Sequence, residues 1–187
     1  MKNIVELLDN ATFIKSPFYN QRPANTVISL LVIHCISLPE GHYGTEHIKN
    51  LFTGNLNCCA DPSFACLDGL EVSAHCVIRR DGCVEQYVPF TERAWHAGVS
   101  SFGGVEGCND FSIGIELEGT DKSAYTEYQY QALIELTKQI QSQYSQITKD
   151  RIVGHSDIAP GRKTDPGSEF NWPRYLSALD YQKNESF

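Results

Sequence analysis

The chain has no long apolar run and a deficit of positive charge. Its 187 residues include 15 lysines and arginines against 23 aspartates and glutamates, a formal net charge of −8 at pH 7. That balance argues against a general affinity for nucleic acid or for an anionic membrane surface. Glu6 and Asp9 interrupt the N-terminal stretch that a signal peptide would keep apolar, and no later segment has the length of a transmembrane helix. We therefore expect a cytoplasmic protein with neither a nucleic-acid nor a membrane partner.

The chain also lacks the cysteine spacing of a structural zinc knuckle. None of its seven cysteines forms a C-x2-4-C pair, and an odd number without an export signal favours reduced thiols over disulfides. Hydrophobic residues at 41% and charged residues at 20% are typical of a globular protein. No internal repeat or linker divides the sequence. We therefore predict a single domain over residues 1–187, acting as a monomer.

Three segments have the pattern of buried strands. The run 27–33 is almost continuously apolar and ends at His34, which predicts a strand buried on both faces with a polar residue at its end. Residues 111–118 alternate between an apolar and a polar or small side chain, as a strand with one core face does. Residues 151–154 predict a short strand that leads into His155.

Turn and capping signals place the remaining elements. The Asp81-Gly82 pair lies between two β-type runs and predicts a hairpin of strands at 72–79 and 83–88. Thr126 and Gln129 resemble a capping box at the start of the longest helix. Shorter helices are predicted at 45–52, capped by Thr45, and near 173–179, with a long loop at 54–70.

Two of the six histidines directly follow strand-like runs. Adjacent strands in a sheet lie about 5 Å apart, so His34 and His155 at neighbouring strand ends can meet at one metal ion. Asp165, in a stretch stiffened by Pro160 and Pro166, is the candidate third ligand. Three protein ligands with an open fourth position are typical of catalytic rather than structural zinc. Such an ion can lower the pKa of water towards ~7.

Five sequence motifs follow one another along the chain. They are LLVIHCISLPEG (30–41), VSAHCVIRRDG (72–82), AWHAGVS (94–100), CNDFSIGIELEG (108–119) and GHSDIAPGRKTDPG (154–167). Together they resemble the zinc amidase superfamily, which also includes peptidoglycan recognition proteins and phage-lysozyme-type amidases. Within it, they resemble the AmpD-type 1,6-anhydro-N-acetylmuramoyl-L-alanine amidases of cell-wall recycling, over about residues 16–180. The resemblance implies an α+β fold, in which helices flank a mixed central sheet with zinc at one rim.

The resemblance also implies roles for single residues. His34, His155 and Asp165 would bind Zn²⁺, Glu116 would accept the proton, and Lys163 would stabilise the transition state. These roles agree with the chemistry of amide hydrolysis, which needs an activated nucleophile, a charge that stabilises the oxyanion, and a group that protonates the leaving amine. The expected reaction cleaves the amide between the lactyl group of anhydro-N-acetylmuramic acid and L-alanine in cytoplasmic muropeptides.

Substrate contacts are predicted at Trp95, His96 and His75. Trp95 can stack on the sugar, His96 can hydrogen-bond the peptide, and His75 lies on a strand that could border the cleft. The chain departs from related amidases at three positions, because they often carry Asn at position 35 and arginines at positions 71 and 107, where this chain has Cys35, Glu71 and Gly107. The group that holds the stem peptide therefore stays open, with Arg79, Arg80, Arg93 and Arg162 as candidates.

Two alternatives compete with this hypothesis. One is an amidase that acts on intact murein rather than on soluble fragments. The other is a muropeptide-binding or sensing protein without catalysis; proteins of that kind typically lose a zinc ligand, whereas this chain has all three candidates. Absence of zinc from the purified protein would favour the second alternative.

Overall fold

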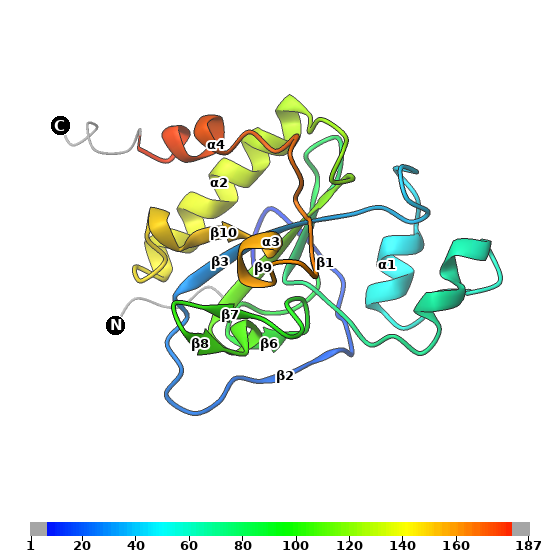
Figure 1. Cartoon of the computed structure of the whole chain (residues 1–187), viewed down its shortest axis with the longest axis horizontal. Helices are drawn as coiled ribbons and strands as arrows, with labels where there is room; N and C mark the ends of the chain where they lie inside the picture. Colours follow the sequence, from blue (N-terminus) through cyan, green and yellow to red (C-terminus); the bar gives the residue numbers. More distant parts are fainter. Residues whose placement is uncertain (1–6, 181–187) are drawn as a thin grey trace.

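A six-stranded mixed β-sheet forms the centre of the computed structural model, which describes residues 7–180 (Figure 1). Its strands are β1 Thr12–Phe13, β3 Leu30–Ile36, β4 Cys76–Ile78, β5 Val84–Gln86, β9 Ser112–Glu118 and β10 Ile152–Gly154. The order across the sheet is β1-β5-β4-β9-β3-β10, and all neighbours are parallel except the antiparallel hairpin of β4 and β5. The α+β fold predicted from the resemblance, a mixed central sheet flanked by helices, is confirmed.

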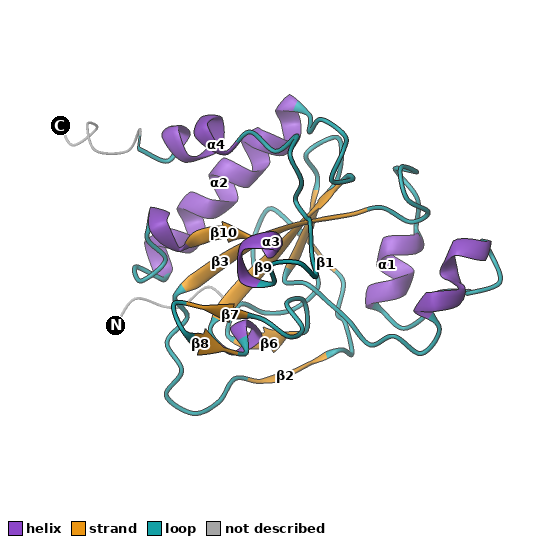
Figure 2. Cartoon of the chain, in the orientation of Figure 1, coloured by secondary structure: helices purple, strands orange, loops and turns teal. Residues whose placement is uncertain are grey.

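Two helices cover one face of the sheet, as Figure 2 shows for α2 Glu127–Gln143 and α4 Trp172–Ala178. The apolar side of β9 packs against them in one buried cluster that includes Ile115, Leu133 and Tyr175. The predicted capping box starts α2, since the Thr126 hydroxyl accepts from the Gln129 N–H and the Gln129 side chain accepts from the Thr126 N–H, each at 3.1 Å. A buried hydrogen bond of 2.6 Å between Thr137 and Tyr175 joins the two helices.

The opposite face of the sheet is covered by short elements. These are β2 Tyr19–Gln21 paired with β6 Glu92–Ala94, β7 Ser101–Phe102 paired with β8 Val105–Glu106, the 3-10 helix η2 Cys108–Asp110, and α3 His155–Ile158. Beneath them, the polar side of β9 is as buried as its apolar side, because every residue of the strand is buried. The remaining elements are α1 His47–Phe52 and the 3-10 helices η1 Pro62–Leu67 and η3 Lys149–Arg151.

Several predicted elements differ from the structure in their bounds. The strand expected at 27–33 begins three residues later and continues to Ile36, so His34 lies inside β3. Its position still marks a strand end, because β10 pairs only as far as Ile33. The strands expected at 72–79 and 83–88 are shorter, since β4 and β5 cover only Cys76–Ile78 and Val84–Gln86.

The region 45–70 also differs. The segment 54–70 contains η1, whose start Asp61 caps. The helix expected at 45 begins at His47, and the Thr45 hydroxyl accepts from the His47 N–H at 3.4 Å and donates to the carbonyl of Leu38.

Within residues 7–180, none of the helices combines the length and apolar character that crossing a membrane requires.

Candidate metal centre and catalytic site

The three predicted metal ligands come together at the end of β10. His34 lies on β3 next to the paired residues Ile33 and Gly154, and His155 follows Gly154 as the first residue of α3. The loop after α3 returns Asp165 to the same place, since the Ser156 N–H donates to the Asp165 carbonyl at 3.0 Å. Both histidines are at most 3% exposed, and 15% of the Asp165 side chain is exposed.

The ligand atoms form a nearly equilateral triangle. The Nδ1 atoms of His34 and His155 lie 2.9 Å apart, and each is 3.0 Å from Oδ2 of Asp165. Hydrogen bonds cannot account for all three of these contacts. Each Nδ1 carries at most one proton, and two N–H groups that both donate to Asp165 would leave the contact between the two histidines without an acceptor. Zn–N and Zn–O distances near 2 Å in a tetrahedral site imply ligand separations of about 3.3 Å. The triangle therefore has close to the size that one metal ion bound by all three side chains requires.

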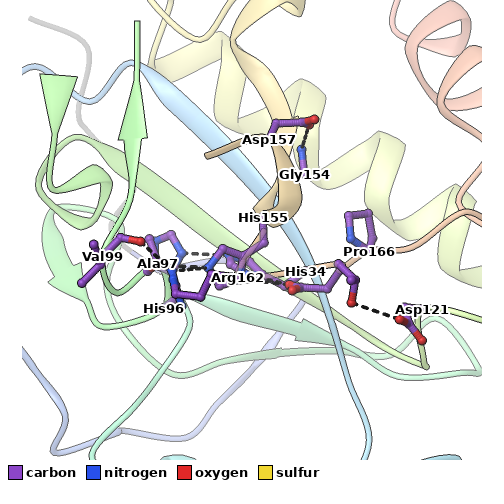
Figure 3. A network of polar contacts seen from close by, with 12 residues as sticks. His34, His96, Ala97, Val99, Asp121, Gly154, His155, Asp157, Arg162 and Pro166 are labelled. Carbon is purple, nitrogen blue, oxygen red and sulfur yellow. Dashed lines mark hydrogen bonds and ion pairs between the residues drawn. The ribbon is translucent and has the colours of Figure 1, made fainter. Parts of the chain in front are cut away.

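The second ring nitrogen of each histidine is also engaged (Figure 3). Nε2 of His155 lies 3.1 Å from the carbonyl of Ala97, and Nε2 of His34 lies 2.9 Å from Nδ1 of His96. Arg162 donates to the same Ala97 carbonyl at 2.6 Å and to that of Val99 at 2.7 Å. Partners of this kind fix the tautomer and the orientation of a ligating imidazole.

Burial and mutual contact keep the ligands in their metal-binding protonation states. Burial lowers the pKa of His34 to about 4, although the hydrogen bond to Asp165 opposes it, so the ring is neutral at pH 7. Burial acts to raise the pKa of Asp165, but the contacts with His155 and His34 outweigh it and hold that pKa below its ordinary value. Asp165 is therefore a carboxylate.

Glu116 lies beside this triangle on the neighbouring strand. It pairs in register with His34 across β9 and β3, is 9% exposed, and its buried Oε2 has no hydrogen-bond partner. Burial and the charge of Asp165 raise the pKa of Glu116 well above its ordinary value, while the charge of Lys163 acts to lower it. A buried carboxyl with an unused oxygen and a raised pKa has the properties of a group that exchanges protons with a ligand.

Lys163 is exposed on the loop that carries Asp165. Its charge acts on the pKa values of both Glu116 and His34. Together with Cys35 and Asp165, it lines a cavity of about 310 Å³ that opens next to the triangle. Burial raises the pKa of the Cys35 thiol to about 12, so this residue faces the cavity as a neutral thiol.

The three predicted substrate residues lie in different surroundings. Trp95 is partly exposed, stacks on Phe18 and donates from its indole N–H to Asn20, and its contact with substrate stays a prediction. His75 is fully buried: its Nδ1 accepts from Gly114, and its Nε2 lies 3.1 Å from the Glu92 carbonyl. The expectation that His75 contacts substrate is therefore wrong, because both ring nitrogens are already committed to the protein.

His96 is half-buried. Both of its ring nitrogens face protein atoms, Nδ1 towards His34 and Nε2 towards the hydroxyl of Ser112 at 3.1 Å. The hydrogen bond from His96 to the peptide stays a prediction. No local sequence pattern predicts that His96 lies against β9, because this position depends on how the 95–98 segment crosses the strand.

The candidate arginines are each held by protein contacts. Arg79 pairs with Glu85 and Glu118, and Arg93 pairs with Asp110. Of the four, Arg162 lies beside the metal ligands, with Nη2 3.4 Å from Nε2 of His155.

Comparison with known proteins agrees with the geometry. A family model described as N-acetylmuramoyl-L-alanine amidase matches residues 23–168. The 1,6-anhydro-N-acetylmuramyl-L-alanine amidase AmpD of Haemophilus influenzae is 53% identical over 173 residues, which cover 92% of this chain and 94% of that protein.

Two solved structures are similar over most of the chain. A selenomethionine derivative of AmpD has a TM-score of 0.92 at 52% identity, covering 96% of this chain and 99% of the other. The amidase AmiD of E. coli, in complex with anhydro-N-acetylmuramic acid-L-Ala-D-γ-Glu-L-Lys, has a TM-score of 0.60 at 33% identity, covering 84% of this chain and 60% of the other.

Proposed function

Because the chain belongs to the N-acetylmuramoyl-L-alanine amidase family, we propose that it hydrolyses the amide between the lactyl group of anhydro-N-acetylmuramic acid and L-alanine, with zinc as its cofactor. The carrying observation is the triangle of His34, His155 and Asp165, whose ligand atoms lie 2.9 to 3.0 Å apart beside Glu116. Metal-assisted hydrolysis needs three side chains that bind the ion and a carboxyl group that exchanges protons with water.

His34, His155 and Asp165 would hold the ion. When bound, a zinc ion would supply a Lewis acid that polarises the amide carbonyl, acidifies water and favours the carboxylate form of Glu116. The two neutral imidazoles and one carboxylate leave the loaded centre with a net positive charge.

Glu116 takes a proton from the attacking water and returns one to the leaving amide nitrogen. Its unused Oε2 is the atom available for this exchange. Lys163, which lines the cavity beside Cys35 and Asp165, contributes the positive charge that stabilises the oxyanion. Its charge also lowers the pKa of Glu116 and so opposes the effect of burial.

The substrate class rests on the relatives. AmpD is named for the anhydro-muramyl amide, and AmiD binds an anhydro-muramyl tripeptide. We assign this chain the same class of soluble anhydro-muropeptide, a place in cell-wall recycling in the cytoplasm, and action as a monomer. Trp95, whose side chain is partly exposed, is the residue we assign to the sugar.

Mass spectrometry of defined muropeptides tests the proposal. Zinc-loaded protein should convert anhydro-N-acetylmuramoyl-L-Ala peptides into the free anhydro-sugar and a peptide that begins with L-alanine. A chelator should stop the reaction, and added zinc should restore it. The reducing-end counterparts, run in parallel, report whether the anhydro ring is required.

Two outcomes would contradict the proposal. Intact muropeptide that binds the zinc-loaded protein without cleavage would favour a binding or sensing role. Cleavage that continues at full rate in chelator would remove the metal from the chemistry.

A further inference from the structure

We infer that His96 is a positioning residue that holds the metal ligand His34 in its zinc-binding tautomer, as a neutral hydrogen-bond acceptor. The inference rests on the proposed zinc site. It concerns a histidine that touches neither Asp165 nor the cavity beside Lys163 in any contact described above, and that acts through His34.

The direction of the hydrogen bond follows from where His34 points. Its Nδ1 faces Asp165 and His155, and must offer a lone pair to bind an ion. The proton of a neutral ring then sits on Nε2, which lies 2.9 Å from Nδ1 of His96. Nδ1 of His96 then accepts this hydrogen bond, and His96 carries its own proton on Nε2, 3.1 Å from the Ser112 hydroxyl. The chain therefore runs from His34 to His96 to Ser112.

The sequence leaves room for this ring at one point of β9. A Cβ at Gly114 would lie 2.5 Å from ring atoms of His96, which is far inside van der Waals contact. The imidazole of His96 therefore packs directly against the backbone of Gly114. A hydrogen bond holds this backbone in place, because the Gly114 N–H donates to Nδ1 of the buried His75 at 3.0 Å.

The backbone of the 96–97 segment is anchored as well. The N–H groups of His96 and Ala97 both donate to Oδ1 of Asn109, at 3.1 and 2.8 Å. The same Ala97 offers its carbonyl to Nε2 of His155. One short segment therefore supplies the outer partner of both histidine ligands, through a side chain for His34 and through the backbone for His155.

An imidazole in this position has a consequence that a carboxylate would not have. It accepts the hydrogen bond from His34 without adding a negative charge. The charge of the centre is therefore set by His34, His155 and Asp165 alone. A more positive centre acidifies water and stabilises an oxyanion more strongly.

The matched pair His96→Asn and His96→Leu tests the inference, because these side chains have nearly the same branched shape. The Asn amide oxygen lies close to the place of Nδ1 and preserves the acceptor, whereas Leu offers none. Zinc affinity is measured by competition with a chelator of known affinity. Loss of an outer partner typically weakens metal binding by about 10–100-fold. We expect a loss of that order in His96→Leu, with most of the affinity retained in His96→Asn.

Two further measurements separate positioning from folding. Denaturant unfolding of both variants in chelator reports any general loss of stability, and Ser112→Ala, which leaves His96 in place, should weaken zinc binding less than His96→Leu. The ¹⁵N signals of the imidazoles report the tautomer: zinc-loaded wild type and His96→Asn should share a protonated Nε2 on His34. Equal zinc affinity in His96→Asn and His96→Leu, with wild type binding zinc tightly, would overturn the inference alone. Failure of wild type to bind zinc would instead overturn the proposed function.

Discussion

His34 and Glu116 occupy directly paired positions on parallel strands, and this pairing fixes how far apart the two side chains start. Side chains at paired positions leave the sheet on the same side, so both reach the same space. Their neighbours along the strands, Ile33 and Ile115, are buried without solvent contact and hold both backbones in place. The acid–base group is therefore positioned by the hydrogen-bonded sheet, which is more rigid than a loop.

Glu116→Gln removes the proton acceptor and keeps the shape of the side chain. We expect zinc content to stay at the wild-type level and kcat to fall by about 10²–10⁴-fold, the usual worth of a positioned general base. Steady-state kinetics and metal analysis of the same sample give both values.

The control for this variant has to come from outside the site. Glu118, two residues along the same strand, is 1% exposed and bonds Arg79 and the N–H groups of Gly44 and Arg80, so its loss would perturb the fold. Glu135→Gln, on the exposed side of α2, should keep both the zinc content and the kcat of the wild type. A near-normal kcat in Glu116→Gln would remove Glu116 as the base.

The metal-free protein should lose stability as the pH falls from about 6.5 to about 4. An unfolded histidine titrates near 6.5, whereas burial lowers the pKa of His34 to about 4 and that of His75 to about 3. The pKa of His96 is lowered as well, whereas the raised pKa of Glu116 acts in the opposite direction. Three histidines outweigh one carboxyl, so in this interval the unfolded chain binds more protons than the folded chain, and the free energy of unfolding decreases on acidification. The depressed pKa of Asp165 extends the loss to lower pH.

Denaturant midpoints measured in chelator across this pH range give the slope. His34→Gln should flatten part of it, and the slope that remains belongs to His75 and other groups. His42→Gln, at an exposed histidine, should leave the slope unchanged. An identical slope in wild type and His34→Gln would contradict the assignment.

The longest helix, α2, is joined to the sheet through its N-cap residue, Thr126. The Thr126 hydroxyl accepts from Gln129 within the capping box and donates to the carbonyl of Arg80 at 2.7 Å, at the turn of the β4–β5 hairpin. Gln129 also donates to the carbonyl of Glu118 at 2.9 Å, at the end of β9. One helix start thus connects three segments of the fold.

Thr126→Ala should lower the free energy of unfolding by about 0.5–2 kcal/mol, the usual cost of losing an N-cap. Zinc affinity should not change, because no ligand is in contact with Thr126. Thr126→Ser, which keeps the hydroxyl, is the matched control and should recover most of the loss. Urea denaturation measures both variants, and an effect of Thr126→Ala on zinc affinity larger than its effect on stability would contradict the prediction.

Elements with a strong period could be predicted from the sequence, and elements set by distant contacts could not. The alternation at 111–118 and the capping box at Thr126 gave β9 and α2 closely, because both patterns reflect the element's own geometry. The start of β3 was placed too early, since apolar character alone does not say where pairing with β9 begins. The Asp61-Pro62 pair is a sequence signal for the start of η1, because Asp61 caps that helix and Pro62 is its first residue.

The same division applies to the site. The convergence of His34, His155 and Asp165 could be predicted, because both histidines follow an apolar strand and Asp165 lies in a proline-bounded loop. The packing of His75 and His96 against β9 could not be predicted, because it depends on Gly114 lying under a segment that is distant along the chain. Chemistry was thus easier to predict than the packing that supports it.

Zinc should stabilise the whole fold, because its ligands come from segments far apart in the sequence. His34 lies on a central strand, whereas His155 and Asp165 bound the α3 loop, and the unfolded chain does not hold these three groups together. An ion that binds only the folded state adds about 4 kcal/mol to the free energy of unfolding when its free concentration is 1,000 times Kd.

Asp165→Ala removes the charged ligand and should abolish most of this increment, while His42→Ala, at an exposed histidine outside the triangle, should keep it in full. The measurement is the shift of the urea midpoint between chelator and buffered zinc for each protein, with the slope of the transition as a check on two-state unfolding. A metal shift of wild-type size in Asp165→Ala would mean that another group binds the ion. No shift in wild type would mean that the triangle binds zinc too weakly to couple the three segments.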